Sequence, residues 1–371
     1  MRAEINTQAF LFVARGLWST LSLFDQKYVV QFCCELAYYE WWKRLKVLTA
    51  LELSARHPRR TPPPDHRAVD WAQLAPLLYP KRSMSDTTTL LNSAPAIPVR
   101  DHFAPMKIVF LLVIHMGAVA ALWHSTWTAV GVCFLMHALC GGVGICVGYH
   151  RLLTHRSFKC PRAVEYSLAL LGSLSMEGGP IVWVAHHRQH HQYPDQRGDP
   201  HGARQGFWWS HVLWMFWTPS AESRGEITHR YAPDLLRVPF YRFLGRMYAW
   251  LSVLAAGLLY VLGGWSFVMW GMFVRLVLTY HTTWLVNSAG HAFGYKNFPI
   301  NDLPTNCWWV ALLTGGEGWH NNHHAFPTSA RHGMRFWEID SAYAFIRSLR
   351  AVGLAWDLQT PPANKLRFSL C

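Results

Sequence analysis

Four stretches of almost uninterrupted apolar residues stand out along the chain, and each is close to the roughly 20 residues that a helix needs to cross a bilayer. They occupy residues 107–123, 127–149, 247–265 and 266–286. Only the sequence His-Ser-Thr separates the first two stretches, and the last two meet at a Gly-Gly-Trp sequence. Connections this short join antiparallel helices. The pattern therefore predicts an all-α integral membrane protein with four transmembrane helices in two hairpins.

Composition and charge support this class of protein and orient it. Of the 371 residues, 51% are hydrophobic and 15% are charged, whereas about 25% charged residues are usual in soluble domains. The two short turns contain no Lys or Arg, and the segments on the opposite side contain many, so these segments are expected to face the cytoplasm. The net charge of +13 then suits anionic lipid headgroups, acidic proteins or phosphate-bearing substrates. No compact basic motif with a groove-reading architecture is present, so nucleic acid is not an expected partner.

The first hundred residues have a different pattern. Residues 1–83 combine an aromatic stretch that is interrupted by charges with a Pro- and Arg-rich linker, which is typical of amphipathic or interfacial sequence. Met84 begins a polar lead-in, residues 84–104, with the composition of an ordinary N-terminus. We therefore expect residues 1–83 to be a dispensable extension or the result of a misassigned start.

Histidines gather in three short motifs outside the apolar stretches or at their ends. They are His150 and His155 in HRLLTH, His187, His190 and His191 in HHRQHH, and His320, His323 and His324 in HNNHH. On an α-helix, residues i+3 and i+4 lie within about 60° of residue i, so each H-x-x-H-H motif is expected to present its three rings to one place. The i, i+5 pair of the first motif lies about 140° apart on a straight helix. Either the helix ends there, or the two rings serve different metals.

The predicted topology places all three motifs on one side of the membrane. His150 ends the second apolar stretch, the second motif lies between the hairpins, and the third motif follows the fourth stretch. Asn287 and His291 lie one helical turn apart at the end of the fourth stretch. Nine histidines exceed what one iron or zinc ion can bind, so two metals are the expected number. Two solvated helix faces with identical spacing on one membrane side are a poorer explanation.

The identity of the metal is not fixed by imidazole alone, which suits Zn, Fe, Cu or Ni. A structural zinc site is complete with four ligands, so two metals facing a membrane point instead to oxygen activation by iron on a hydrocarbon that partitions into lipid. Asp195, Asp199 and Glu317 are placed to accept hydrogen bonds from ligand N–H groups.

Four segments carry a resemblance to a known family. They are GYHRLLTHRSF, WVAHHRQHHQYPDQRGDPHGARQGFWWSH, TWLVNSAGH and NCWWVALLTGGEGWHNNHHAFPTSARHG. Together they resemble the membrane fatty acyl desaturases of the Δ9 acyl-CoA and acyl-lipid type, over residues 105–357, with residues 358–371 as a tail. The resemblance implies a cytoplasmic helical cap above the four membrane helices and a di-iron centre. It implies ligand roles for His150, His155, His187, His190, His191, His291, His320, His323 and His324, with Asn287 reaching iron through water.

The resemblance also implies a reaction. In the family, iron, O2 and two electrons from a ferredoxin or a small haem cytochrome convert a saturated acyl chain into a cis-unsaturated one. No fused haem-domain motif such as HPGG is present, so the donor is expected to be a separate protein. The substrate is expected to be an acyl-CoA or acyl-lipid, desaturated at Δ9 in a multi-pass protein of a bacterial inner membrane whose active site faces the cytoplasm.

Four residues are expected to line a bent substrate tunnel. Trp183 and Thr283 match residues that line the bend in the family, and Trp284 is a further candidate. Glu177 stands where relatives commonly have Gln, and a buried carboxyl needs a proton or a cationic partner. We therefore expect an altered double-bond position or a substrate with a polar substituent. Arg275 is a second unusual residue, because a charge within a membrane span is generally functional or paired and the sequence indicates no partner for it.

Two other functions remain open from the sequence. A membrane hydroxylase or another oxygenase can share the histidine motifs, although the first-motif spacing and the GDPH and NSAGH elements favour desaturation. A membrane metal carrier or sensor would also gather histidines, but a transporter is expected to hold its ligands at bilayer depth, whereas these histidines lie at one surface.

Overall fold

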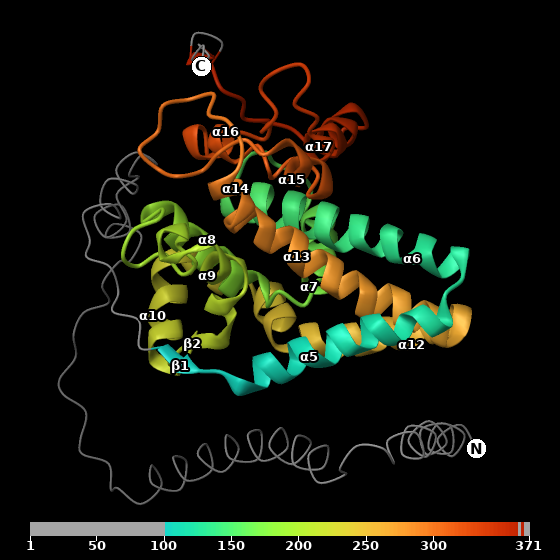
Figure 1. Cartoon of the computed structure of the whole chain (residues 1–371). Coiled ribbons are helices and arrows are strands. Elements are labelled where there is room, and N and C mark those ends of the chain that lie inside the picture. The colour runs from blue at the N-terminus through green and yellow to red at the C-terminus, as the bar shows by residue number, and fades with distance from the viewer. Residues whose placement is uncertain (1–100, 363–364, 367–371) are drawn as a thin grey trace, which may run out of the picture. The chain divides into compact units, whose positions relative to one another are not determined.

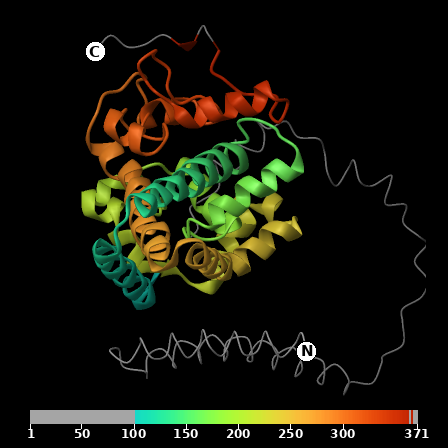
Figure 2. The same ribbon diagram turned by 90° about the vertical axis from the view of Figure 1, so that its right-hand side faces the viewer.

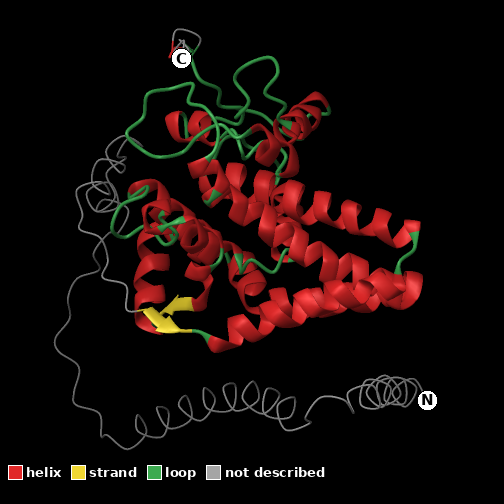
Figure 3. Cartoon of the chain, viewed as in Figure 1, coloured by secondary structure: helices red, strands yellow, loops and turns green. Residues whose placement is uncertain are grey.

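The computed structural model describes residues 101–362 and 365–366 of the chain. Nearly all regular structure in this part is helical (Figure 3). The exception is a pair of three-residue strands, β1 (Asp101–Phe103) and β2 (Trp217–Pro219), which run antiparallel and depart slightly from the expected all-α architecture. The expectations for residues 1–83, for most of residues 84–104 and for the end of the tail lie outside the described residues.

Three helical segments are long and apolar enough to cross a membrane: Pro105–His124, Trp127–Thr154 and Pro239–Ala292. The first two comprise α5 (Pro105–Ala120), η2 (Ala121–His124), α6 (Trp127–His137) and η3 (Ala138–Thr154). The third comprises α12 (Pro239–Val268), η6 (Met269–Val274), α13 (Arg275–Asn287) and α14 (Ala289–Ala292). Many large apolar side chains on these segments are exposed, including Leu112, Met116 and Val261. An apolar surface of this kind is expected to contact lipid, so the fold is that of a helical membrane protein.

The third apolar segment is interrupted at Gly263 and Gly264, where the backbone leaves the helical conformation. Gly264 has φ 63° and ψ −155°, which is a conformation open essentially to glycine alone. Across this break Leu259 packs directly against Gly271, where an added Cβ would lie 2.8 Å from a leucine methyl. The chain therefore doubles back at the Gly-Gly-Trp sequence, as the hydrophobic pattern predicted.

The helix that leads to the first histidine motif, η3, is a π-helix. It packs backbone to backbone against α7 (Arg162–Ser173): a Cβ added to Gly144 would lie 2.4 Å from the backbone nitrogen of Gly172. The next helix, α8 (Pro180–Gln192), packs against both η3 and α7 and carries the second motif. Glycines thus let η3 approach α7 closely, and α8, which packs against both, brings the second motif beside the first.

Shorter elements surround the ends of these helices. They are η4 (Ala203–Gln205), α9 (Phe207–His211), η5 (Leu213–Phe216), α10 (Ala221–Tyr231), α11 (Pro233–Leu236), α15 (Trp308–Leu313), α16 (His320–Ala325) and α17 (Ser341–Ala351). α14, α15, α16 and α17 gather at one end of the long helices (Figure 1), and the turned view shows the same segments above the bundle (Figure 2). This C-terminal part brings the third histidine motif to the other two.

Candidate metal centre

Nine histidine side chains from separate parts of the chain meet in one buried or half-buried cluster. They are His150 and His155 at the end of η3, His187, His190 and His191 on α8, His291 on α14, and His320, His323 and His324 on α16. Neighbouring rings are in contact, with centroids 4.5 Å apart for His150 and His323 and 5.0 Å apart for His291 and His320. The structure thus brings together all nine histidines that the sequence singles out.

The nine rings divide into two groups. The first histidine group comprises His150, His155, His187, His191 and His323, each of which offers a ring nitrogen within 4.8 Å of the others. The second histidine group comprises His190, His291 and His320 by the same criterion, together with His324, whose ring centroid lies 4.6 Å from that of His320. Each group contains enough nitrogen donors for one metal ion.

The expectation that each H-x-x-H-H motif faces one place is wrong, because each motif is shared between the two groups. On α8, His187 and His191 join the first group and His190 joins the second. On α16 the division is reversed, with His323 in the first group and His320 and His324 in the second. The reason is helical geometry: residue i+4 lies about 40° from residue i on one side, and residue i+3 lies about 60° away on the other.

In the first motif, His150 and His155, both histidines belong to the same group. The helix ends at Thr154, and the backbone N–H of His155 donates to the carbonyl of His150 over 3.1 Å. This i to i−5 hydrogen bond belongs to the wider π-helix, which places residues i and i+5 about one turn apart. The ring centroids of His150 and His155 are therefore only 4.8 Å apart, and both rings belong to the first group.

Burial favours the neutral form of several of these imidazoles. Burial, together with the neighbouring imidazoles, holds the pKa of His187, His320 and His323 well below the usual value. The Nε2 atoms of His323 and His191 lie 2.9 Å apart, and the buried Nε2 atoms of His155 and His320 have no hydrogen-bond partner. Neutral imidazole nitrogens gathered at such distances are the kind of donor set that a transition metal ion requires.

Carboxylates lie within hydrogen-bond distance of the Nδ1 atom of three rings, as expected from the sequence. The Nδ1 atoms of His190, His291 and His150 lie 2.9, 3.1 and 2.7 Å from carboxylate oxygens of Asp199, Asp195 and Glu317 respectively. A carboxylate at Nδ1 fixes a proton there, so it directs the lone pair of Nε2 toward the centre of the group.

The sequence analysis singled out neither Asp302 nor His332. Asp302 lies 3.4 Å from Nδ1 of His324, and the ring of His332 lies 4.5 Å from that of His323 while its Nδ1 is 3.2 Å from Glu317. Asp302 sits in a loop that no spacing rule connects to the motifs. Only the path of the chain after α14 brings it to the second group.

A buried ion network supports the first group from outside. The Arg151 side chain is fully buried and contacts Glu317 at 3.1 Å and Asp340 at 2.9 Å. Burial alone would raise the pKa of Glu317, but His150 and Arg151 beside it hold that pKa well below its usual value. Glu317 therefore stays ionised and can accept a hydrogen bond from Nδ1–H of His150.

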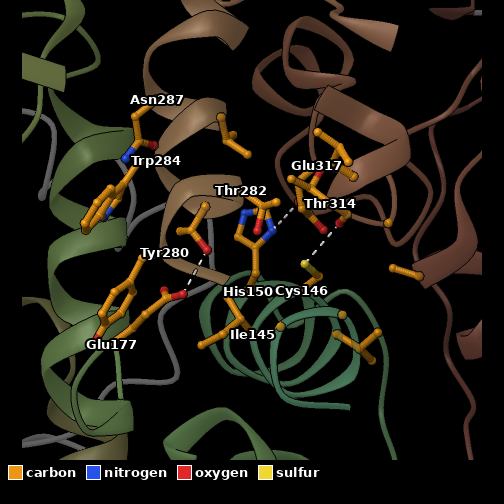
Figure 4. A pocket seen from close by; sticks show the side chains of 18 of the residues that line it. Ile145, Cys146, His150, Glu177, Tyr280, Thr282, Trp284, Asn287, Thr314 and Glu317 are labelled. Atoms are coloured by element: carbon orange, nitrogen blue, oxygen red, sulfur yellow. Dashed lines mark hydrogen bonds and ion pairs between the residues drawn. The ribbon is translucent and has the colours of Figure 1, made fainter. Parts of the chain in front are cut away.

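A cavity of about 420 Å³ leads away from the histidines. It runs beside η3 from His150 to His137, and apolar groups such as Ile145 form much of its wall (Figure 4). Glu177, Trp183, Thr283 and Trp284, the four expected tunnel residues, all line it. Asn287 also lines this cavity, one turn before His291. The volume and lining suit a narrow apolar ligand.

Glu177 crosses this cavity between two of the other expected residues. Its carboxylate accepts hydrogen bonds from Nε1 of Trp183 over 3.0 Å and from Oγ1 of Thr283 over 2.8 Å. Burial raises the pKa of Glu177 to about 7, and these two hydrogen bonds offset only part of the effect. The carboxyl is therefore neutral below about pH 7.

A second cavity of about 1130 Å³ lies beside the first and is lined by apolar groups and by groups of both charges, among them Lys107, Arg197 and Arg204 and the carboxylates Asp195, Asp199 and Asp302. His186 and Trp214 line both cavities. The apolar cavity thus adjoins a space that can hold a polar or anionic group.

Comparison with known proteins identifies relatives over most of the described chain. A family model described as fatty acid desaturase matches residues 125–357. The chain is 47% identical over 258 residues to the sn-2 palmitoyl-lipid 9-desaturase of Nostoc sp. (strain 36), which covers 69% of this chain and 90% of that protein. It is 44% identical over 256 residues to the acyl-CoA C20 Delta5-desaturase of Anemone leveillei, covering 68% and 81%. It is 42% identical over 263 residues to the Delta-9 acyl-lipid desaturase 1 of Arabidopsis thaliana, covering 71% and 85%.

Proposed function

Because the chain belongs to the fatty acid desaturase family, whose members are oxidoreductases, we propose that it uses two iron ions and O2 to introduce a cis double bond, at Δ9, into a saturated acyl chain. The observation that carries this proposal is the meeting of two groups of imidazole nitrogens at the head of an apolar cavity. The first histidine group would hold one iron and the second group the other, with Asn287 acting through water.

The protein's own part in this reaction is placement. A methylene group in mid-chain offers no acidic or basic handle, so bound iron supplies the oxidising chemistry and the protein selects the carbon by position. The cavity beside η3 would hold the acyl chain extended past His150, with Trp183, Thr283 and Trp284 shaping its path. The carboxylates behind the histidines orient the ligands, and the buried surroundings exclude water.

The second cavity would hold the carrier end of the substrate. Lys107, Arg197 and Arg204 would face an anionic headgroup or cofactor carrier, while the acyl chain enters past His186 and Trp214. Named relatives act on acyl-lipids and on acyl-CoA, and we propose one of these two as the substrate. Two electrons would come from a separate ferredoxin or small haem cytochrome. If this donor is acidic, a basic cytoplasmic face would speed its association with the protein.

We place the protein in a bacterial inner membrane with four crossings. The segment Pro239–Ala292 would cross twice, because its chain doubles back at Gly263 and Gly264. Together with Pro105–His124 and Trp127–Thr154, this puts both hairpin turns on one side of the membrane and both histidine groups on the other. The positive-inside bias assigns the histidine side, with the elements around it as a cap, to the cytoplasm.

Expression in a host that lacks monounsaturated lipids tests the proposal. The wild-type chain, supplied with iron, O2 and a reductase with ferredoxin, is expected to restore cis-monounsaturated acyl chains with the double bond at C9. Gas chromatography with mass spectrometric location of the double bond measures the product. Hydroxylated acyl chains would instead indicate the related oxygenase activity, and unchanged lipids from a membrane-inserted, iron-loaded protein would reject both.

Glu177→Gln is expected to remove a pH dependence near neutrality. In the wild type the carboxyl loses its proton as the pH rises through about 7, and the resulting charge disfavours an apolar chain in the cavity. The apparent kcat/KM should therefore fall above pH 7 in the wild type and stay level in the variant. Assays between pH 6 and 8 measure this, with the exposed Glu226→Gln change as the control. Equal profiles for the wild type and Glu177→Gln would contradict it.

The same variant tests the expected effect of Glu177 on specificity. Glutamine keeps the size of the side chain but can donate as well as accept hydrogen bonds, so the contacts with Trp183 and Thr283 must rearrange. The distribution of double-bond positions or the preferred chain length is expected to change. Unchanged product and substrate profiles would reject a role for Glu177 in specificity.

A further inference from the structure

The turn between α7 and α8 carries Glu177 into the cavity, and its backbone is strained. Met176 has φ 61° and Gly178 has φ 106°. A residue with a side chain rarely adopts a positive φ, and it does so only where the surrounding structure enforces it. Something outside the turn must therefore hold Met176 in place.

A large part of the restraint comes from a neighbouring helix, α13. Nη1 of Arg275 donates to the carbonyl of Leu174 over 2.8 Å, and the hydroxyl of Tyr280 donates to the carbonyl of Met176 over 2.7 Å. Farther along the same helix, Thr283 donates to the carboxylate of Glu177. Three donors that follow one another along α13 thus bind three residues that follow one another along the turn.

Arg275 is the most unusual member of this set. Its side chain is fully buried, and no carboxylate of the described residues lies within 4.0 Å of it. Its other donors reach the carbonyl of Gly271 at 3.1 Å and the sulfur of Met272 at 3.4 Å. Leu174 is the C-cap of α7, and a cation at a helix C-terminus is stabilised by its free carbonyl groups and dipole. The carbonyl groups at the start of the turn therefore stabilise the positive charge of Arg275.

Tyr280 links the restraint to the substrate path. Its ring lines the same cavity as Glu177 (Figure 4) and stacks on Trp284 at a centroid distance of 5.3 Å. The Tyr280 hydroxyl fixes the backbone one residue before Glu177. A displacement of this backbone would move the side chain that crosses the cavity.

We propose that Arg275 and Tyr280 form a clamp on residues 174–178 that sets where Glu177 crosses the cavity, and thereby which carbon of the acyl chain lies at the metal centre. The proposal rests on the proposed function, since it requires an acyl chain in this cavity. The two residues are positioning residues, because they act through the turn and not on the reacting atoms. A displacement of about 1 Å is enough to change reaction rates by roughly 10²-fold, so a loosened turn lets neighbouring carbons compete.

Tyr280→Phe tests the clamp with the smallest change. It removes one hydroxyl and keeps the stacked ring, so the protein is expected to insert in the membrane and to bind iron as the wild type does. The fraction of product with a shifted double bond is expected to rise at least about fivefold, the order that one unmade buried hydrogen bond produces. Tyr260→Phe, at a half-exposed position on α12, is the matched control. Arg275→Met is expected to give a larger shift in the same direction.

The possible results separate the clamp from a general structural role. Lower total activity with unchanged double-bond positions and unchanged iron content in Tyr280→Phe would overturn the clamp. A shifted product profile at normal iron content would support it, even if Arg275→Met fails to accumulate. A wild-type protein that makes no unsaturated product would overturn the proposed function, and the clamp with it, whereas desaturation by the wild type with unshifted variants overturns the clamp alone.

Discussion

His323→Ala is expected to reduce desaturation below detection and to lower the iron content of the purified protein. The His323 side chain is fully buried, and its Nε2 lies 2.9 Å from Nε2 of His191 and 3.1 Å from Nε2 of His150. It therefore stands at the centre of the first histidine group. Loss of a residue that only supports a ligand costs roughly 10–100-fold in metal affinity, and loss of a ligand at this position should cost more.

Metal analysis of protein purified from membranes measures the iron content, and lipid analysis of the expressing cells measures desaturation. His229→Ala is the matched control, because His229 is exposed on α10 and far in the chain from the motifs. It should leave both readouts at the wild-type level. Full iron content together with full activity in His323→Ala would show that the first histidine group does not bind metal.

Arg151→Met is expected to destabilise the protein by about 3–5 kcal/mol, the usual cost of removing one partner from a buried ion pair. Methionine fills much of the space, but it leaves Glu317 and Asp340 buried without the cation that contacts both. It also leaves the carbonyl of Ala330 without the 2.8 Å hydrogen bond from Arg151. Because Glu317 in turn holds His150, iron should be lost more readily as well.

Thermal unfolding of the detergent-solubilised protein measures this effect, and a fall in Tm of about 10 °C is expected for a loss of this size. Arg156→Met provides the control. Arg156 pairs with Asp234 on the surface, where its side chain is 55% exposed, and such pairs contribute about 1 kcal/mol or less. Similar shifts in Tm for both variants would contradict a special role for the Arg151 network.

The parts of the fold that depend on local pattern could be predicted from the sequence. The apolar stretches predicted the membrane helices and the Gly-Gly-Trp reversal, and the histidine spacing with the predicted topology brought nine rings together. The membership of the desaturase family, and with it the oxidoreductase class, is confirmed by the comparisons. The ligand roles, the two irons and the electron donor remain proposals.

The remaining features depend on tertiary arrangement. Helix geometry directs His190 to the other side of α8 from His191, but only the tertiary arrangement brings histidines of α16 to both sides and so forms two groups. The proximity of His150 and His155 follows from a π-helix, which the sequence pattern does not distinguish from an α-helix. Likewise, the partner of Arg275 is a backbone carbonyl of Leu174, and side-chain patterns carry no information about such an acceptor.

Because α8 and α16 each supply histidines to both groups, the two proposed iron sites are mechanically linked. Each helix contributes to both histidine groups, so the spacing between the groups is set by the rise and rotation of a single helical turn. Backbone hydrogen bonds keep that length nearly constant. Two ions bound in these groups would therefore share one rigid frame, and we expect them to load cooperatively and to keep a constant separation even when the surrounding loops move.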